Sequence, residues 1–172
     1  NDNRYIDRIS SGFSIGASHQ YILMNESTSL LIEPKIQFSS VFSSDRTDEV
    51  PNRDSAEFRL DQANLFLNNQ FQGRDNIQKN SRINFGVTSL VMTENLGDIN
   101  FFIGQSQKVS GTQKNVTLAN EDRQSHIINS IDWNPSEMYK FSWFSLYNHH
   151  NFKSDTSDFN FSGSYNGWSY SI

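Results

Sequence analysis

Residues 64–87 read NLFLNNQFQGRDNIQKNSRINFGV, a polar loop that runs directly into a region of strict alternation. From Arg82 onward, apolar Ile83, Phe85 and Val87 alternate with polar or small residues. A period of two places successive side chains on opposite faces of a β-strand. We therefore expect a strand here with one apolar face and one polar face.

The same alternation recurs along most of the chain. It predicts strands near residues 11–23, 28–42, 82–93, 99–110, 125–133, 138–149, 156–166 and 168–172. Four apolar residues fall on otherwise polar faces, namely Phe102, Ile128, Phe144 and Leu146. At these positions either the inner face is apolar or the register shifts at a bulge. Alternation alone also fits a soluble antiparallel sheet with one hydrated face.

The connections between the expected strands alternate in length. The short ones are rich in turn-forming residues and are Asn25–Ser27, Asn95–Asp98, Asn134–Glu137 and Asn166–Gly167. The long ones cover residues 42–81 and 110–124, and a connection near 151–155 is intermediate. Outer-membrane β-barrels combine short turns on the periplasmic side with longer extracellular loops. This parity favours a barrel, and the Asn166-Gly167 dipeptide is typical of a tight hairpin.

The composition is compatible with such a barrel. The chain has 172 residues, 35% of them hydrophobic, a mean hydropathy of −0.64 and no run near the roughly 18 apolar residues of a membrane helix. A barrel strand averages to a polar composition because lipid-facing and lumen-facing residues alternate. The aromatic content of 13% suits girdles at the two membrane interfaces. A soluble sandwich can be equally rich in aromatic residues.

Three motifs, in this order, resemble those of the lipopolysaccharide-assembly outer-membrane protein family, also called organic solvent tolerance proteins. They are LIEPKIQF at 31–38, the loop at 64–77 and IDWNPS at 131–136. Within the loop motif, Phe71, Gly73, Asp75 and Ile77 match the family pattern, whereas Gln70, Gln72, Arg74 and Asn76 depart from its commonest residues. The ordered similarity carried by the three motifs extends over most of the chain, from residue 31 to residue 136.

The resemblance implies an all-β protein, an antiparallel transmembrane β-barrel section of about eight strands from a larger outer-membrane barrel. Residues 1–172 would belong to one barrel domain with long loops at 42–81 and 110–124. The N-terminus lacks the basic start and apolar run of a signal peptide, and Ile172 falls within a strand, so we expect a middle section of a longer chain. It would lack the family's periplasmic domain and the terminal strands that form its lateral gate.

The implied function is transport and insertion of lipopolysaccharide into the outer leaflet of a Gram-negative outer membrane. The implied partners are lipopolysaccharide, membrane lipid, a plug lipoprotein in the lumen and periplasmic bridge proteins. Polar strand residues would then line a hydrated path; the candidates are Glu33, Lys35, Gln37, Arg82, Asn84, Thr88, Asn160 and Ser162. Any one of them is equally well explained as ordinary wet lining. We interpret Phe71, Gly73, Asp75 and Ile77 as structural, packing the loop over or into the barrel mouth.

Other functions have weaker support. Asp45, Asp48, Glu49 and Asp54 could gather a divalent cation, but they follow no fixed ligand spacing, and a solvated charged loop explains them better. A rim enzyme would have to use His149 or His150 with Asp155, or Asp45 with Asp48. Adjacent His149 and His150 are expected on opposite strand faces, which makes them a poor chelating pair. We expect no cofactor, and a net charge of −5 offers no basic stripe for nucleic acid. A soluble β-sandwich binding module remains the third alternative.

Overall fold

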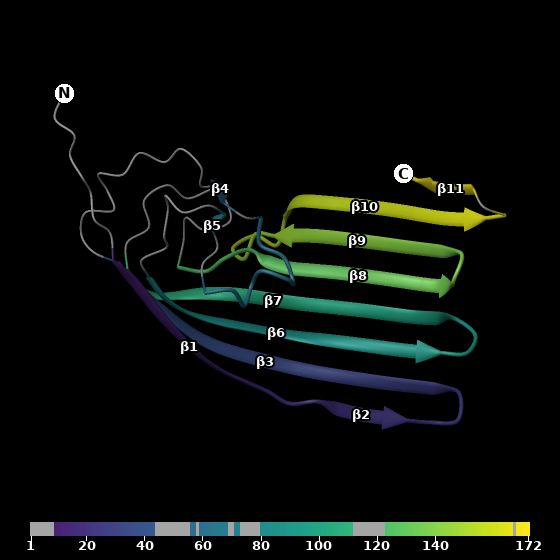
Figure 1. The fold of residues 1–172 in the computed structure, drawn as a ribbon, viewed down its shortest axis with the longest axis horizontal. Helices are drawn as coiled ribbons and strands as arrows, with labels where there is room; N and C mark the ends of the chain where they lie inside the picture. Colours follow the sequence, from purple (N-terminus) through teal and green to yellow (C-terminus); the bar gives the residue numbers. More distant parts are fainter. Residues whose placement is uncertain are drawn as a thin grey trace.

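The computed structural model describes residues 9–43, 56–57, 59–68, 71–72, 80–111, 123–166 and 168–172. Its main element is one antiparallel sheet of nine strands, which confirms the all-β antiparallel prediction. In spatial order the strands are β1 (Ser10–Ser18), β3 (Thr28–Ser43), β6 (Asn80–Thr93), β7 (Gly97–Gly111), β8 (Ile127–Ser136), β9 (Tyr139–Tyr147), β10 (Ser154–Tyr165) and β11 (Trp168–Ser171), with β2 (Tyr21–Met24) paired beside β3 (Figure 1). A separate two-stranded sheet joins β4 (Ala56–Glu57) to β5 (Phe71–Gln72).

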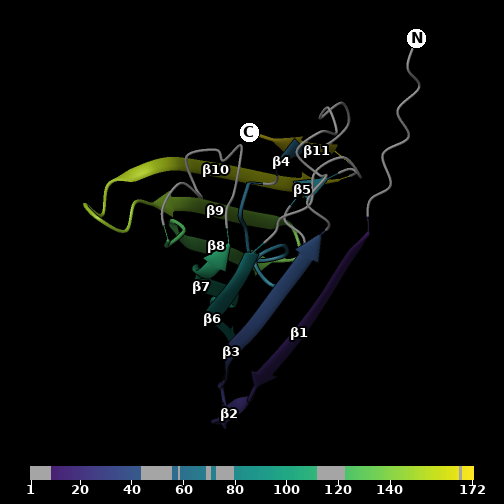
Figure 2. The same cartoon turned by 90° about the vertical axis from the view of Figure 1, so that its left-hand side faces the viewer.

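The large sheet is curved but not closed, with β1 and β2 at one edge and β11 at the other (Figure 2). The short hairpin connections lie at one end of the strands, and the strand ends that the long connections join lie at the opposite end (Figure 1). Segment 59–68 lies within the curve of the sheet (Figure 2). We call the face it contacts the concave face and the opposite one the convex face. Among the described residues, no helix is long and apolar enough to cross a membrane.

The expected strand over 11–23 is two strands, β1 and β2, which share one register against β3. The break falls at His19 and Gln20, opposite Pro34. The backbone N–H of His19 donates to the carbonyl of Pro34 at 3.3 Å, but proline has no N–H with which to return the second bond of the pair. The pairing therefore weakens at this point and resumes at Tyr21.

The short connections are close to expectation, with two corrections. The turn expected at Asn95–Asp98 lies at residues 94–96, because β6 ends at Thr93 and β7 already begins at Gly97. The strands β10 and β11 are joined at Asn166-Gly167 and pair from Tyr165 to Trp168, and Asn166 has a φ of 48°, as a tight hairpin turn requires. The expected turn at 134–137 is wrong in extent, because β8 continues to Ser136. A register shift between Trp133 and Ser136 absorbs the residues that we had placed in the turn.

The convex face carries a continuous ladder of aromatic rings near the hairpin end of β8, β9, β10 and β11. Trp133 stacks on Phe141 at 5.1 Å between ring centroids, and Phe141 contacts Phe161 at 4.7 Å. Phe161 in turn contacts Tyr170 at 5.7 Å. Direct cross-strand neighbours on one face are close enough for such contacts, and so are diagonal neighbours such as Phe161 and Tyr170. The alternation predicted from the sequence therefore produces one face that is largely aromatic and aliphatic in this region.

Candidate functional site: the concave face and the segment docked on it

The polar candidates on β3 and β6 lie on the concave face. Asn84 is fully buried, its amide donates to the side-chain oxygen of Gln37 at 3.0 Å, and it accepts a hydrogen bond from Ser106 at 2.7 Å. The register pairs Lys35 with Gly86 and Glu33 with Thr88, so these four residues share the same face as Asn84. Five candidates thus form one polar strip, with Arg82 directly beyond Asn84.

Arg82 is almost completely buried and binds the loop rather than open solvent. Its guanidinium group donates to the backbone carbonyl of Leu67 in segment 59–68. Arg82 therefore helps to hold the chain that lies over the concave face.

The last two candidates lie at the far side of the same face. Asn160 pairs with Ser142, and Ser162 pairs with Lys140, in the register of β9 and β10. Ser142 donates to Asp132 at 2.6 Å, so hydroxyl and carboxylate groups continue the polar surface here. Asn160 is exposed and Ser162 is partly exposed. They are too distant in the strand order to contact the Gln37–Asn84 strip, so the eight candidates form two groups.

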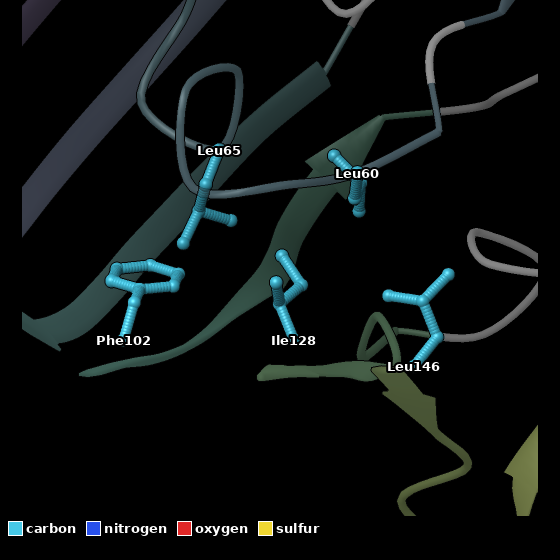
Figure 3. Close-up of a cluster of buried hydrophobic side chains, with 5 residues drawn as sticks. All are labelled: Leu60, Leu65, Phe102, Ile128 and Leu146. Carbon is cyan, nitrogen blue, oxygen red and sulfur yellow. The ribbon is translucent and has the colours of Figure 1, made fainter. Parts of the chain in front are cut away.

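Between these two groups, the concave face is apolar. Phe102, Ile128 and Leu146 project from β7, β8 and β9 and are 2%, 0% and 5% exposed. Leu60 and Leu65 of segment 59–68 cover them and are both completely buried (Figure 3). These three strand residues, with Phe144 beside them, are the four that interrupted the sequence alternation. Of our two explanations, the locally apolar inner face is the right one.

Two glycines make room for this contact. A Cβ on Gly104 would lie 2.7 Å from a methyl group of Leu65 and 2.6 Å from the ring of Phe102. A Cβ on Gly86 would lie 2.9 Å from the same ring. Real carbon atoms do not approach so closely, so any larger residue at these positions would displace the ring or the loop. The ring of Phe102 can lie this close to Gly86 and Gly104 because neither position carries a side chain.

The docked segment is shaped by its own hydrogen bonds. The side chains of Asp61 and Asn64 each accept a hydrogen bond from the other residue's backbone N–H at 2.9 Å. The amide of Asn64 also donates to the carbonyl of Arg59 at 2.7 Å. Asp and Asn favour such turns because their short side chains reach nearby backbone groups. The turn directs Leu60 and Leu65 toward the sheet from opposite ends of one loop.

Charged groups fasten both ends of the docked segment. The guanidinium group of Arg59 forms an ion pair with Asp158 of β10 and lies 4.3 Å from the ring centre of Phe144. The ammonium group of Lys35 lies 4.5 Å from the ring centre of Phe66. A cation over an aromatic face contributes about 0.5–1 kcal/mol at an exposed site. Lys35, which we expected to line a path, therefore contacts the segment directly.

The loop residues singled out from the sequence have a mixed outcome. Gly73, Asp75 and Ile77 lie outside the described residues, and Phe71 begins the short strand β5. The residues that pack on the sheet lie upstream, in segment 59–68. Residues 64–68 belong to the loop motif of the sequence analysis, but neither Leu60 nor Leu65 was singled out there. The signal of this segment was present, since Leu60, Leu65 and Phe66 are apolar residues within a polar connection.

The residues considered for a rim enzyme or a metal site are arranged differently from expectation. His149 and His150 do not point to opposite faces; β9 ends at Tyr147, and the two rings lie 3.9 Å apart between centroids in the following turn. The carboxylate of Asp155 contacts the buried ring of His126. Asp45, Asp48, Glu49 and Asp54 lie outside the described residues. Across the part of the chain that the structure describes, no three His, Cys, Asp or Glu residues gather as metal ligands.

The comparison with protein families agrees with this architecture. The model of the family LptD, "LPS transport system D", matches residues 1–172. The chain belongs to the LptD family. A comparison with curated proteins finds no match. LptD proteins are a transport family of the outer membrane that takes part in lipopolysaccharide transport, not an enzyme family.

Proposed function

We propose that this LptD chain forms part of the wall of an outer-membrane translocon that inserts lipopolysaccharide into the outer leaflet of a Gram-negative bacterium. The observation that carries the proposal is the division of the curved sheet into a convex face that is largely apolar and a concave face that is largely polar. A wall with lipid on one side and a hydrated lumen on the other needs this division. Residues 1–172 then belong to one barrel domain.

Apolar side chains form a band across the convex face. The line along which this band ends, on the side of the long connections, supports the placement of the convex face against lipid. On β3 and β6 the first polar convex pair toward the long connections is Ser40 and Ser81. On β7 the limit is Gln105, and on β8, β9 and β10 it is the row of Asn129, Ser145 and Ser157, which lies level with Val87 in the register. The limit therefore crosses the sheet obliquely, toward the hairpin end.

An oblique limit is the geometry of tilted strands in a flat bilayer. Averaged from β3 to β10, the limit moves by six residues over five strand spacings, which at about 3.3 Å per residue and about 4.8 Å between strands corresponds to a strand tilt of about 40°. Transmembrane barrels have tilts of about 35–45°. Trp143 lies next to the limit, and its indole N–H donates to Ser157 at 2.9 Å. Tryptophan favours membrane interfaces because its ring is apolar while its N–H is polar.

The concave face supplies the surface for the polar part of the transported lipid. Sugars and phosphates cannot cross hydrocarbon unaided, since each unsatisfied polar group costs several kcal/mol there. Glu33, Gln37, Thr88, Asn160 and Ser162 would line the hydrated route, whereas the fully buried Asn84 would hold Gln37 in place beneath it. Lys35 and Arg82 would act mainly by holding segment 59–68, which narrows the route. None of these residues acts as a chemical catalyst in this proposal.

A transport-dependent cross-link tests this role in the full-length protein. A photoreactive amino acid at Asn160 on the concave face should capture lipopolysaccharide only while new molecules are being delivered. At Phe159 on the convex face it should capture lipid of the resident leaflet, whether or not delivery continues. If blocking lipopolysaccharide synthesis leaves the Asn160 adduct unchanged, Asn160 does not lie on the route.

The placement of the sheet in the membrane also predicts on which side of the membrane each set of connections lies. The long connections would lie outside the cell and the hairpin turns in the periplasm. Cysteines introduced singly at Asn151 and Asn95, both exposed, are to be labelled on intact cells with an impermeant thiol reagent. Labelling is expected at position 151 only. The reverse pattern would invert the topology. The plug lipoprotein and the periplasmic bridge proteins remain proposed partners.

A further inference from the structure

A second group of apolar side chains lies on the concave face, near the hairpin end of β2, β3 and β6 (Figure 1). Leu90 lies an even number of residues from Asn84 along β6, in a register with β3 that has no shift between them, so it points to the same face. Leu31 is its partner on β3, and Ile22 is the partner of Leu31 on β2. We call this group the inner patch, and its members are Ile22, Met24, Leu31, Leu90 and Met92.

The inner patch is exposed, in contrast to the apolar group beneath segment 59–68. Ile22 is 58% exposed, Met24 79% and Met92 40%. Phe102, which projects from the concave face of β7, is only 2% exposed because segment 59–68 covers it. Among the described residues, no comparable segment lies over the inner patch.

The concave face changes character between β6 and β7 at the level of the inner patch. The register row that contains Ile22, Leu31 and Leu90 continues across β7, β8, β9 and β10 through polar residues. These are Asn100, Asp132, Ser142 and Asn160. A wall that needed only hydration would be polar along the whole row. Because exposed apolar patches with a polar rim mark interaction sites, the apolar half of the row indicates a contact surface.

Four carboxylates border the inner patch, those of Glu26, Glu33, Glu94 and Asp98. Asp98 pairs with the patch residue of β6 nearest the turns and shares the concave face. Glu33 lies on the same face of β3 and accepts a hydrogen bond from Gln20 at 2.8 Å. The backbone N–H of Glu94 donates to the carbonyl of Ser27 at 3.4 Å, which joins the β6–β7 turn to the turn that holds Glu26.

The negative charge around the inner patch has no basic counterpart nearby in the sequence. Residues 20–34 and 83–107, which form this part of the wall, contain the four carboxylates but no lysine or arginine. Such a surface repels an anionic lipid and attracts a cationic partner. An apolar patch bordered by charge of one sign therefore fits a protein segment in which apolar side chains stand beside lysine or arginine.

We propose that the inner patch is the docking site of a periplasmic protein, which places an apolar segment flanked by lysine or arginine against Leu31 and Leu90. The inference rests on the proposed function, because it needs a luminal concave face and periplasmic hairpin turns. The partner enters from the turn side, where Glu26 and Glu94 meet its basic residues first. The far end of β3 at Ser43 is about 40 Å from Leu31, at about 3.3 Å per residue, so the long connections join strand ends far from the patch.

Photo-cross-linking of the full-length protein in living cells tests the occupant. The photoreactive residue p-benzoylphenylalanine at Leu90 should form an adduct with a protein of the periplasm. Sequencing of the cross-linked peptide should show lysine or arginine beside apolar residues. Ser142, in the polar half of the same register row, is the matched control position and should not capture this peptide. Equal capture at both positions would mean that the inner patch is not the docking site.

Charge variants test whether the carboxylates select the partner. Glu33→Gln combined with Asp98→Asn keeps the side-chain sizes and removes two charges. The yield of the Leu90 adduct should fall by about three- to tenfold, the effect of losing two exposed ion pairs. Asp132→Asn removes one charge from the polar half of the row and should leave the yield unchanged. Both variants must show native heat-modifiable migration on gels. An unchanged yield in the double variant would overturn recognition by charge.

The identity of the Leu90 adduct separates failure of this inference from failure of the proposed function. An adduct with lipopolysaccharide that depends on new delivery would overturn the protein site but keep the concave face on the transport route. An adduct with membrane phospholipid would mean that the concave face is not luminal, so the proposed placement itself fails. The absence of any adduct would leave the patch in contact with water and overturn the docking site.

Discussion

Two neighbouring regions of the concave face are buried for opposite reasons, one through hydrogen bonds between polar side chains and the other through apolar contact with the docked segment. Asn84, within the polar strip, is fully buried, and its amide is satisfied by Gln37 and Ser106. The patch around Ile128 is buried and apolar, and segment 59–68 covers it. The comparison shows that an inward apolar residue in this fold marks the place where chain, rather than water, lies against the wall.

The largest expected effect breaks the apolar half of this comparison. Leu65→Asp places a charge in a completely buried site and removes a leucine from the cluster, which should weaken docking of segment 59–68 by about 3–5 kcal/mol. Trypsin cleavage after Arg59 in the folded full-length protein measures the undocking. Leu67→Asp is the control, because Leu67 is 46% exposed. Equal cleavage rates in the two variants would refute the docked arrangement.

A second change extends the comparison from the concave face to the convex one. Val87→Arg should destabilise the assembled barrel by about 2–4 kcal/mol, since a charge near the bilayer midplane is costly. Thr88→Arg, the next residue on the same strand, points toward the concave face and should cost much less. Unfolding by urea in lipid vesicles gives both values. Similar losses for the two variants would mean that the facing of β6 is wrong.

A third change tests the polar half. Asn84→Leu keeps the side-chain size but removes both hydrogen bonds, and leaves the amide of Gln37 and the hydroxyl of Ser106 to find other partners. The expected loss is about 1–3 kcal/mol in the same unfolding measurement. Asn160→Leu is the contrast, because Asn160 is exposed and water already surrounds it. A larger loss at Asn160 than at Asn84 would contradict the burial that distinguishes the two groups.

The smallest effect concerns the fastening of the docked segment. Arg59→Met keeps an unbranched side chain but removes the ion pair with Asp158 and the cation over Phe144. We expect docking to weaken by about 1 kcal/mol, because both partners of the pair are half exposed and are screened by water. At low salt, hydrogen exchange of segment 59–68 should be faster in the variant than in the native protein. At high salt the difference between the two rates should be smaller, because salt screens the ion pair of the native protein. An exchange rate identical to the native one would assign docking to the apolar contacts alone.

The strands could be predicted because their information is local. Ile83, Phe85 and Val87 alternate with polar residues, and this period requires a two-faced strand whatever its neighbours are. The position of Asn166-Gly167 likewise determined a hairpin, since the turn geometry depends on these two residues. The ends of the strands were predicted less well at two prolines: β1 and β2 are separated opposite Pro34, and β8 continues past Pro135. The effect of a missing N–H depends on which neighbouring strand would have accepted the bond.

The sequence by itself determined the approximate positions of the strands, their two-faced character and the family resemblance. It also contained the irregular residues Phe102, Ile128, Phe144 and Leu146, but not their meaning. Only the tertiary structure decided that Leu60 and Leu65 cover them, that Asp155 pairs with His126, and that the convex polar limit crosses the sheet obliquely. The physical reason is that alternation is a property of one strand, whereas these contacts join residues far apart in the chain and depend on strand register and sheet curvature.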